Sequence, residues 1–257
     1  MDLGLSGGTA LVTGGTSGIG LATVQMLLDE GMSVATCGRS RERIETACAR
    51  LRGSSALRCE SVDVRDTDAV SAFVTDVAAP HGLDLLVCNA GQGRRSMFAD
   101  TTSEEWRDEL DLKLFSVLNP LRAAIPALRE RSGAVVITNA VLARQPEPQM
   151  VATSAARAMV LNLSRSLANE LAPEIRVNSI LIGLVESGQW QQRWETTDSS
   201  VNRDRWLTEI AADRGIALGR LGLPEEAAAA IAFLGSRRAS FITGAALEVD
   251  GGVARYA

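Results

Sequence analysis

The sequence predicts a single-domain α/β fold in which helices cover both faces of a parallel sheet. From the first residues onward, short apolar and β-branched runs alternate with longer stretches of helical periodicity. Residues 83–89 are apolar almost throughout, as expected for a strand that is buried on both faces. Strands and helices that alternate at this spacing give parallel strands joined by right-handed crossovers, and such strands form a doubly wound sheet.

The individual elements follow from the same patterns. We expect strands at residues 9–13, 32–37, 56–61, 83–89, 134–139, 176–182 and 247–249. We expect helices at about residues 18–30, 40–52, 67–78, 103–131 and 151–171. Within the fourth of these helices, Pro120 and Pro126 predict kinks or breaks.

One long irregular region, residues 183–222, follows the sixth predicted strand and contains three tryptophans. Ligands of such folds bind at the carboxyl ends of the strands, so we interpret this region as a helical lid or substrate loop. A helical pair that the tryptophans merely pack in place is the alternative.

Composition limits the classes of partner. The chain has 257 residues, and its 26 lysine and arginine residues against 31 aspartate and glutamate residues give a net charge of −5. The arginines are scattered, so neither nucleic acid nor a membrane is expected as a partner. No basic region followed by an apolar run begins the chain, which favours a cytoplasmic location. The four cysteines form no CxxC pair, so we expect reduced, mostly buried thiols and no metal site.

A glycine-rich turn lies between the first predicted strand and its helix. Residues 13–20 read TGGTSGIG. Glycines allow the backbone to turn sharply and to approach a pyrophosphate, while the helix N-terminus directs its free N–H groups at the anion. The position after a strand and before a helix is the context that supports such a motif. The sequence therefore predicts a Rossmann-type dinucleotide site.

The spacing TGxxxGxG resembles that of the short-chain dehydrogenase/reductase family, and further matches follow in order along nearly the whole chain. Residues 63–64, 89–91 and 176–179 resemble the family's adenine-contacting pair, its NAG motif and the start of its sixth strand. Residues 183–187 resemble the stretch that holds the nicotinamide carboxamide, although Ile182 stands where the family has proline. Residues 241–244 and 250–252 resemble the family's C-terminal segment.

The resemblance implies a nicotinamide cofactor, a small-molecule carbonyl or alcohol substrate and a homotetramer in which helices 103–131 and 151–171 pair across two-fold axes. The cofactor-binding residues that it implies are Gly14, Thr16, Ser17, Gly18, Ile19, Gly20, Arg39, Asp63, Val64, Asn89, Ala90, Gly91, Arg157, Gly183, Val185 and Ser187.

The end of the second strand bears on the choice between NAD and NADP. A carboxylate there would bond the adenosine ribose and repel a 2′-phosphate. This chain has Gly38 followed by Arg39, whose guanidinium can pair with a phosphate in a bidentate manner. We therefore expect NADP to be preferred over NAD, although Arg39 could instead stack on adenine or lie in solvent.

The family's catalytic residues are replaced. Where the family has tyrosine and lysine in a YxxxK motif, this chain has Thr153 and Arg157. The serine position falls at Ala140, directly after Asn139, and the position of the asparagine that completes the proton relay holds Lys113. A threonine hydroxyl is far too weak an acid to replace a tyrosine, and arginine cannot readily exchange a proton. The candidate catalytic residues are therefore Lys113, Asn139, Thr153 and Arg157.

Lys113 is the only lysine in the chain, and Tyr256, at its far end, is the only tyrosine. If Lys113 is buried beside Arg157, desolvation and like-charge repulsion should lower its pKa and suit it to acid/base or Schiff-base chemistry. The alternative is an ammonium that points outward and pairs with Asp108 or Asp111.

Three classes of function remain open. The first is an NADP(H)-dependent oxidoreductase that uses a non-standard route. The second is a lyase, isomerase or dehalogenase that uses the same pocket without net redox chemistry. The third is a catalytically inactive dinucleotide-binding or regulatory subunit. The intact glycine turn favours the first and third classes over the second.

Overall fold

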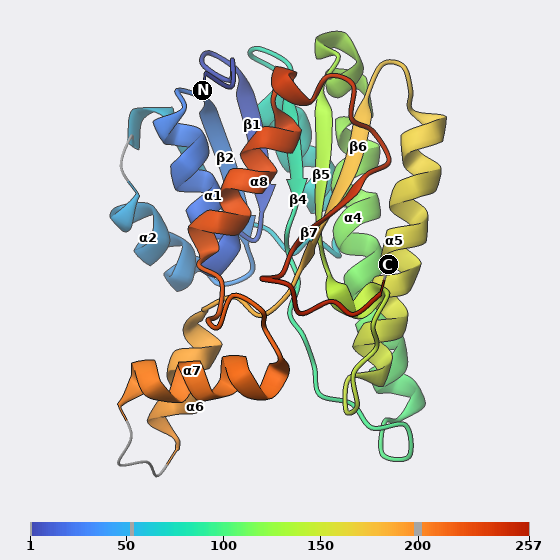
Figure 1. Ribbon diagram of the computed structural model, residues 1–257. Coiled ribbons are helices and arrows are strands. Elements are labelled where there is room, and N and C mark those ends of the chain that lie inside the picture. Colours follow the sequence, from blue (N-terminus) through green and yellow to red (C-terminus); the bar gives the residue numbers. More distant parts are fainter. Residues whose placement is uncertain (1, 52–53, 198–201, 257) are drawn as a thin grey trace.

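A parallel sheet forms the centre of the computed structural model, which describes residues 2–51, 54–197 and 202–256 (Figure 1). Within these residues the strand order is β3-β2-β1-β4-β5-β6-β7, and every neighbouring pair is parallel. The order reverses between β1 and β4, which is the point where doubly wound sheets bind their ligands. The strands are β1 (Thr9–Thr13), β2 (Ser33–Gly38), β3 (Leu57–Ser61), β4 (Leu85–Cys88), β5 (Ala134–Ala140), β6 (Arg176–Ile182) and β7 (Ala246–Val249).

Helices cover both faces of the sheet, as predicted. On one face, α3 (Thr67–Ala78), α4 (Ser103–Arg131) and α5 (Val151–Glu170) pack against a core of Val, Leu and Ile side chains. On the other face lie α1 (Gly18–Asp29) and α8 (Pro224–Gly235), which also contact each other (Figure 1). Within the described part of the chain, no helix is both long enough and apolar enough to cross a membrane.

Helix α4 runs without a break through Pro120 and Pro126, so the predicted break is wrong, while a kink stays a prediction. A proline inside a helix removes a backbone hydrogen bond and normally disrupts the helix. Here Pro120 is buried, together with Val117, Leu121 and Leu128 of the same helix. Burial of this apolar face compensates for the hydrogen bonds that the two prolines remove. A capping box between Thr102 and Glu105 fixes where the helix begins.

The described part of residues 183–222 contains two helices, which fits both the helical lid and the packed helical pair that the sequence allowed. Helices α6 (Gly188–Glu195) and α7 (Arg203–Arg214) lie beyond the carboxyl ends of the strands, at the lower left of Figure 1. The rings of Trp190 and Trp206 meet edge to face with centroids 6.1 Å apart. Leu207 and Ala211 of α7 are buried beside Leu181 at the end of β6. The pair is therefore packed against the edge of the sheet where a ligand would bind.

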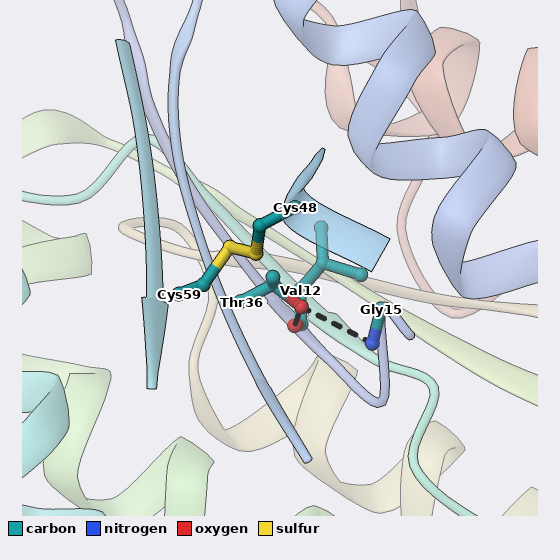
Figure 2. The surroundings of a disulfide bond; sticks show 5 residues. All are labelled: Val12, Gly15, Thr36, Cys48 and Cys59. Atoms are coloured by element: carbon teal, nitrogen blue, oxygen red, sulfur yellow. Dashed lines mark hydrogen bonds between the residues drawn. A yellow bond between two sulfur atoms is a disulfide. The ribbon is translucent and has the colours of Figure 1, made fainter. Parts of the chain in front are cut away.

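A disulfide joins Cys48 of α2 (Arg41–Arg50) to Cys59 of β3, which contradicts the expectation that all four cysteines are reduced (Figure 2). Cys37 and Cys88 are free and buried. The pairing escaped prediction because the two residues are 11 positions apart and meet only when α2 folds back beside β3. Helix α2 is thereby tied covalently to the sheet near the glycine-rich turn.

Candidate functional site

The glycine-rich turn leaves β1 and crosses the carboxyl end of the sheet between β2 and β4. The Thr36 hydroxyl of β2 accepts a hydrogen bond from the Gly15 amide at 3.1 Å and donates to the Val12 carbonyl at 2.7 Å (Figure 2). On the other side, the Asn89 amide group donates to the carbonyls of Thr13 and Gly14, each at 3.1 Å. Two neighbouring strands therefore hold the turn in place.

The spacing of this turn leaves no room for side chains at its glycines. A β-carbon at Gly20 would lie 2.3 Å from the Gly14 carbonyl oxygen, and one at Gly14 would lie 2.8 Å from the Ala90 Cα. Gly18 differs: its φ is +51°, and a β-carbon there would meet nothing within 4 Å. The Ser17 side chain makes no capping bond to the first turn of α1, where Gly18 and Ile19 begin the helix. The helix N-terminus thus faces open space with amides available for an anion, as a pyrophosphate site requires.

The residues predicted to contact the adenosine lie at the ends of β2 and β3. Thr16 of the turn packs so closely that a β-carbon at Gly38 would lie 2.9 Å from its methyl group. Arg39 follows and is exposed, and the Ser40 side chain then caps α2. Asp63 lies just beyond β3, where hydrogen bonds from Arg65 and the charge of Arg39 outweigh its partial burial and lower its pKa. A guanidinium and a carboxylate therefore flank the place where an adenosine would lie.

The other predicted cofactor residues lie along the same edge of the sheet. Val64 is buried, and its carbonyl accepts from the Asn119 side chain of α4 at 3.0 Å. The backbone at Gly183 lies so close to Asp250 that a β-carbon on Gly183 would be 2.8 Å from the Asp250 Cα. Val185 pairs with Gly222 in an isolated bridge, and the Ser187 carbonyl accepts from the Trp190 amide as α6 begins. Residues 183–187 thus connect β6 to the helical pair.

Arg157 of α5 reaches the end of β5. Its Nη1 donates to the Thr138 carbonyl at 2.8 Å, and its backbone carbonyl accepts from the Asn139 side chain at 3.1 Å. The Asn139 side-chain oxygen in turn accepts from the Ala140 amide at 2.9 Å. The Arg157 Nε is buried and has no hydrogen-bond partner among the described residues. Burial lowers the pKa of Arg157 to about 10, while the charge of Glu109 opposes that effect. Arg157 therefore stays protonated near neutral pH.

Lys113 is buried, with 2% of its side chain exposed, and its Nζ lies 3.0 Å from the Glu109 carboxylate. Desolvation, reinforced by the charge of Arg157, lowers the pKa of Lys113 from 10.5 to about 8, although Glu109 acts in the opposite direction. A β-carbon placed on Gly91 would lie 3.9 Å from the Nζ, so the amine sits beside the end of β4. The amine also donates to the Gln92 carbonyl.

The alternative in which Lys113 points outward toward Asp108 or Asp111 is wrong. Asp108 instead pairs with Arg65 at 3.0 Å and with Arg94 at 3.9 Å, outside the buried group. Glu109, which the sequence analysis did not single out, is the residue that meets Lys113. Its position four residues before Lys113 on one helix face was the available signal.

Thr153 does not face an open pocket. It is 1% exposed, and its hydroxyl lies 2.8 Å from Glu109 Oε1 and 3.1 Å from the Arg94 carbonyl. The same hydroxyl accepts a hydrogen bond from the Arg94 amide at 3.3 Å. The structure therefore brings together Lys113, Thr153 and Arg157 at the predicted site and adds Glu109.

Tyr256 packs beside the segment that follows β5. The Arg144 guanidinium lies over its ring at 5.5 Å from the centroid, and the neighbouring Arg255 amide donates to the Gln145 side chain at 2.8 Å. The C-terminal segment is thus fixed against the loop that follows β5.

Comparisons with known proteins identify the family of the chain. Residues 14–254 match the family model described as enoyl-(acyl carrier protein) reductase. A 3-oxoacyl-[acyl-carrier-protein] reductase from Chlamydia muridarum is 35% identical over 251 residues, which cover 95% of this chain and 96% of the relative.

Solved structures are also similar. An apo short chain oxidoreductase from Pseudomonas aeruginosa, described as containing an atypical catalytic center, is 49% identical over the full length of both chains with a TM-score of 0.95. An NADPH-bound structure of a Pseudomonas aeruginosa short chain oxidoreductase with the same description is 49% identical, covers 97% of this chain and 98% of that chain, and has a TM-score of 0.91. The L-sorbose reductase of Gluconobacter frateurii, in complex with NADPH and L-sorbose, is 31% identical over both full lengths with a TM-score of 0.93. The chain belongs to the short-chain dehydrogenase/reductase family of oxidoreductases.

Proposed function

We propose that this protein is an NADP(H)-dependent oxidoreductase that interconverts a small carbonyl compound and its alcohol, with Lys113 as the proton donor and acceptor. One observation carries the proposal: the only lysine of the chain is buried at the relay position, where its surroundings lower its pKa to about 8. Proton transfer is most effective when the pKa of the catalytic group lies near the working pH.

The residues present fit a phosphorylated dinucleotide. The open N-terminus of α1 would hold the pyrophosphate, and Arg39 would pair with a 2′-phosphate. Arg157 keeps the positive charge at the family's lysine position, and its guanidinium would bond the ribose hydroxyls. The NADPH complexes of the Pseudomonas and Gluconobacter relatives support this assignment.

Reduction of a carbonyl group adds a hydride to its carbon and a proton to its oxygen. A bound reduced nicotinamide would supply the hydride. The Lys113 ammonium would supply the proton, become a neutral amine and take up a proton from solvent before the next turnover. Thr153 cannot do this because its hydroxyl is far too weak an acid. Arg157 stays charged and supplies electrostatic stabilisation beside the developing oxyanion.

The hydrogen bond from Lys113 to Gln92 indicates how a substrate would meet the amine. The Lys113 Nζ already donates to a carbonyl oxygen, that of Gln92. A substrate carbonyl has the same hydrogen-bonding chemistry and would replace it when the exposed segment 91–95 shifts. Lys113 would then reach the substrate without changing its contact with Glu109.

The burial of Lys113 also favours a second candidate. With 2% of the side chain exposed, the amine touches no open pocket in the structure. In a dinucleotide-binding protein that catalyses no reaction, the Lys113 amine would stay buried in this way at all times.

Substitution of Lys113 separates the two candidates. Loss of NADPH absorbance would be followed with a panel of ketoses and 3-oxoacyl thioesters, the substrate classes named for relatives. We expect Lys113→Met and Lys113→Arg both to lower kcat by about 100-fold or more while leaving the Kd for NADPH nearly unchanged. Arg122→Met, which removes an exposed charge from the same helix, is the matched control and should keep full turnover. Full turnover by Lys113→Met would refute the amine mechanism, and NADPH binding without turnover on any substrate would favour the second candidate.

A further inference from the structure

One carboxylate oxygen links two of the four replaced family positions. Glu109 Oε1 lies 3.0 Å from the Lys113 Nζ of its own helix and 2.8 Å from the Thr153 hydroxyl of α5. All three side chains are nearly inaccessible, with 3%, 2% and 1% exposed for Glu109, Lys113 and Thr153. A carboxylate buried this deeply is costly unless cations and hydrogen-bond donors surround it.

The same contacts fix the segment after β4. A hydroxyl has one hydrogen to donate, and a bond to a charged carboxylate is stronger than one to a neutral carbonyl. Thr153 therefore donates to Glu109, and its oxygen remains free to accept from the Arg94 amide at 3.3 Å. Lys113 holds the same segment at the Gln92 carbonyl. Glu109 thus orients both side chains that anchor residues 92–94.

The charges around Lys113 come from three elements. Glu109 faces it from α4, and Arg157 faces it from α5. From the segment after β4, the Arg94 guanidinium turns outward to Glu105 at 2.9 Å and Asp108 at 3.9 Å. Among the described residues, Glu109 is therefore the anionic neighbour of Lys113 and Arg157 the cationic one, and burial and Arg157 both act against its proton.

We propose that Glu109 is a positioning residue for Lys113, which keeps the amine protonated and in place at the end of β4. This inference rests on the proposed role of Lys113. Without the carboxylate, desolvation and Arg157 would act unopposed, and the amine would lose its proton and with it the ability to donate one.

The test measures the protonation of Lys113 directly. Protein made with ¹³Cε-labelled lysine gives one lysine signal, because the sequence has one lysine. In Glu109→Gln we expect the Lys113 pKa to fall by roughly 1 pH unit or more from its value of about 8. The pH at which carbonyl reduction declines should fall by the same amount. Glu104→Gln, the same charge change at an exposed site on α4, should move neither value.

Glu109→Asp keeps the charge but shortens the side chain, so it should lower the Lys113 pKa by less than Glu109→Gln does. If Glu109→Gln does not fold, the Lys113 pKa measured in Glu109→Asp tests the inference by itself. A Lys113 pKa unchanged from the unsubstituted protein in the folded variant overturns the inference. Because the NMR titration needs no turnover, it separates this failure from that of the catalytic role, which Lys113→Met tests.

Discussion

Burial of the Lys113 amine makes the stability of the protein depend on pH in a specific direction. The unfolded chain binds the lysine proton up to its ordinary pKa of 10.5, whereas the folded chain releases it at about 8. Between these values the unfolded state binds more protons, so the contribution of Lys113 to the free energy of unfolding rises with pH. Below about pH 8 both states are protonated, and the full cost of burying the charge is present.

We therefore expect the unsubstituted protein to become more stable relative to Lys113→Met as pH rises from about 8 to about 10.5. The difference between their free energies of unfolding should change by on the order of 2–3 kcal/mol. Cys37 and Cys88, whose buried thiols have pKa values raised to about 12, act in the opposite direction but equally in both proteins. Denaturant titrations at both ends of the range measure the difference. A difference that does not vary with pH would show that Lys113 keeps its ordinary pKa.

Arg39 gives a prediction about the cofactor. It is exposed beyond β2, where a guanidinium pairs more strongly with a charged 2′-phosphate than with a neutral ribose hydroxyl. NADPH should bind more tightly than NADH, and Arg39→Ala should remove about 1.5–3 kcal/mol of that difference, roughly 10- to 150-fold in Kd. Arg41→Ala, an exposed residue paired with Glu45 on α2, is the control. Equal affinities for both dinucleotides in the unsubstituted protein would contradict the assignment.

At the scale of single elements, the disulfide between α2 and β3 supports the cofactor turn. Cys59 lies opposite Thr36 in the register of β2 and β3, and the Thr36 hydroxyl binds the Gly15 amide. The bond connects residues 11 positions apart, which restricts the unfolded chain modestly.

We expect Cys48→Ser to lower the free energy of unfolding by about 2–4 kcal/mol under non-reducing conditions. A dithiol reductant should destabilise the unsubstituted protein by a similar amount and have no further effect on Cys48→Ser. Equal stability of the two proteins without reductant would show that the bond does not form in solution.

The elements differ in how far the sequence predicts them. The strands and most helices follow from hydrophobic periodicity, so β1, β6 and α3 lie within the predicted bounds. Helix α8 was missed although Pro224 at its first turn and Glu226, which accepts from the Leu223 amide at 2.7 Å, are ordinary start signals. The interior of α8 is rich in alanine, so its two faces differ little in hydrophobicity. The prolines of α4 led to the incorrect prediction of a break, because burial of the helix in the folded protein outweighs the local effect of proline on helix formation.

The candidate site also has one part that local sequence patterns predict and another part that they do not. The glycine turn and residues 89–91 are local motifs whose geometry the sequence already implies. The contacts of Thr153 with Arg94 and Glu109 join residues 59 and 44 positions apart, and no local pattern encodes them. The position of Lys113 was predictable by alignment with the family motif, but its partner depended on which face of α4 is buried.

For the whole molecule, family membership leads us to predict a homotetramer in which α4 and α5 pair with their counterparts across two-fold axes. Multi-angle light scattering at micromolar concentration should give a mass about four times the 27.2 kDa of the chain. A monomer at that concentration would be inconsistent with the prediction. The cytoplasmic location also stays a prediction. Because disulfides are rare in the cytosol, the redox state of Cys48 and Cys59 in the purified protein should be measured as well.

We propose that a buried lysine has replaced the tyrosine-based proton relay in this family member. Because Lys113 is the only lysine among 257 residues, a pH titration of the ¹³Cε-lysine signal reports on that one group in the intact protein. We predict one titration midpoint at about 8, matched by the pH at which carbonyl reduction falls as the donor loses its proton. A midpoint at the ordinary lysine value of about 10.4 would contradict the account, because an amine with that pKa would not be set up to exchange a proton near neutral pH.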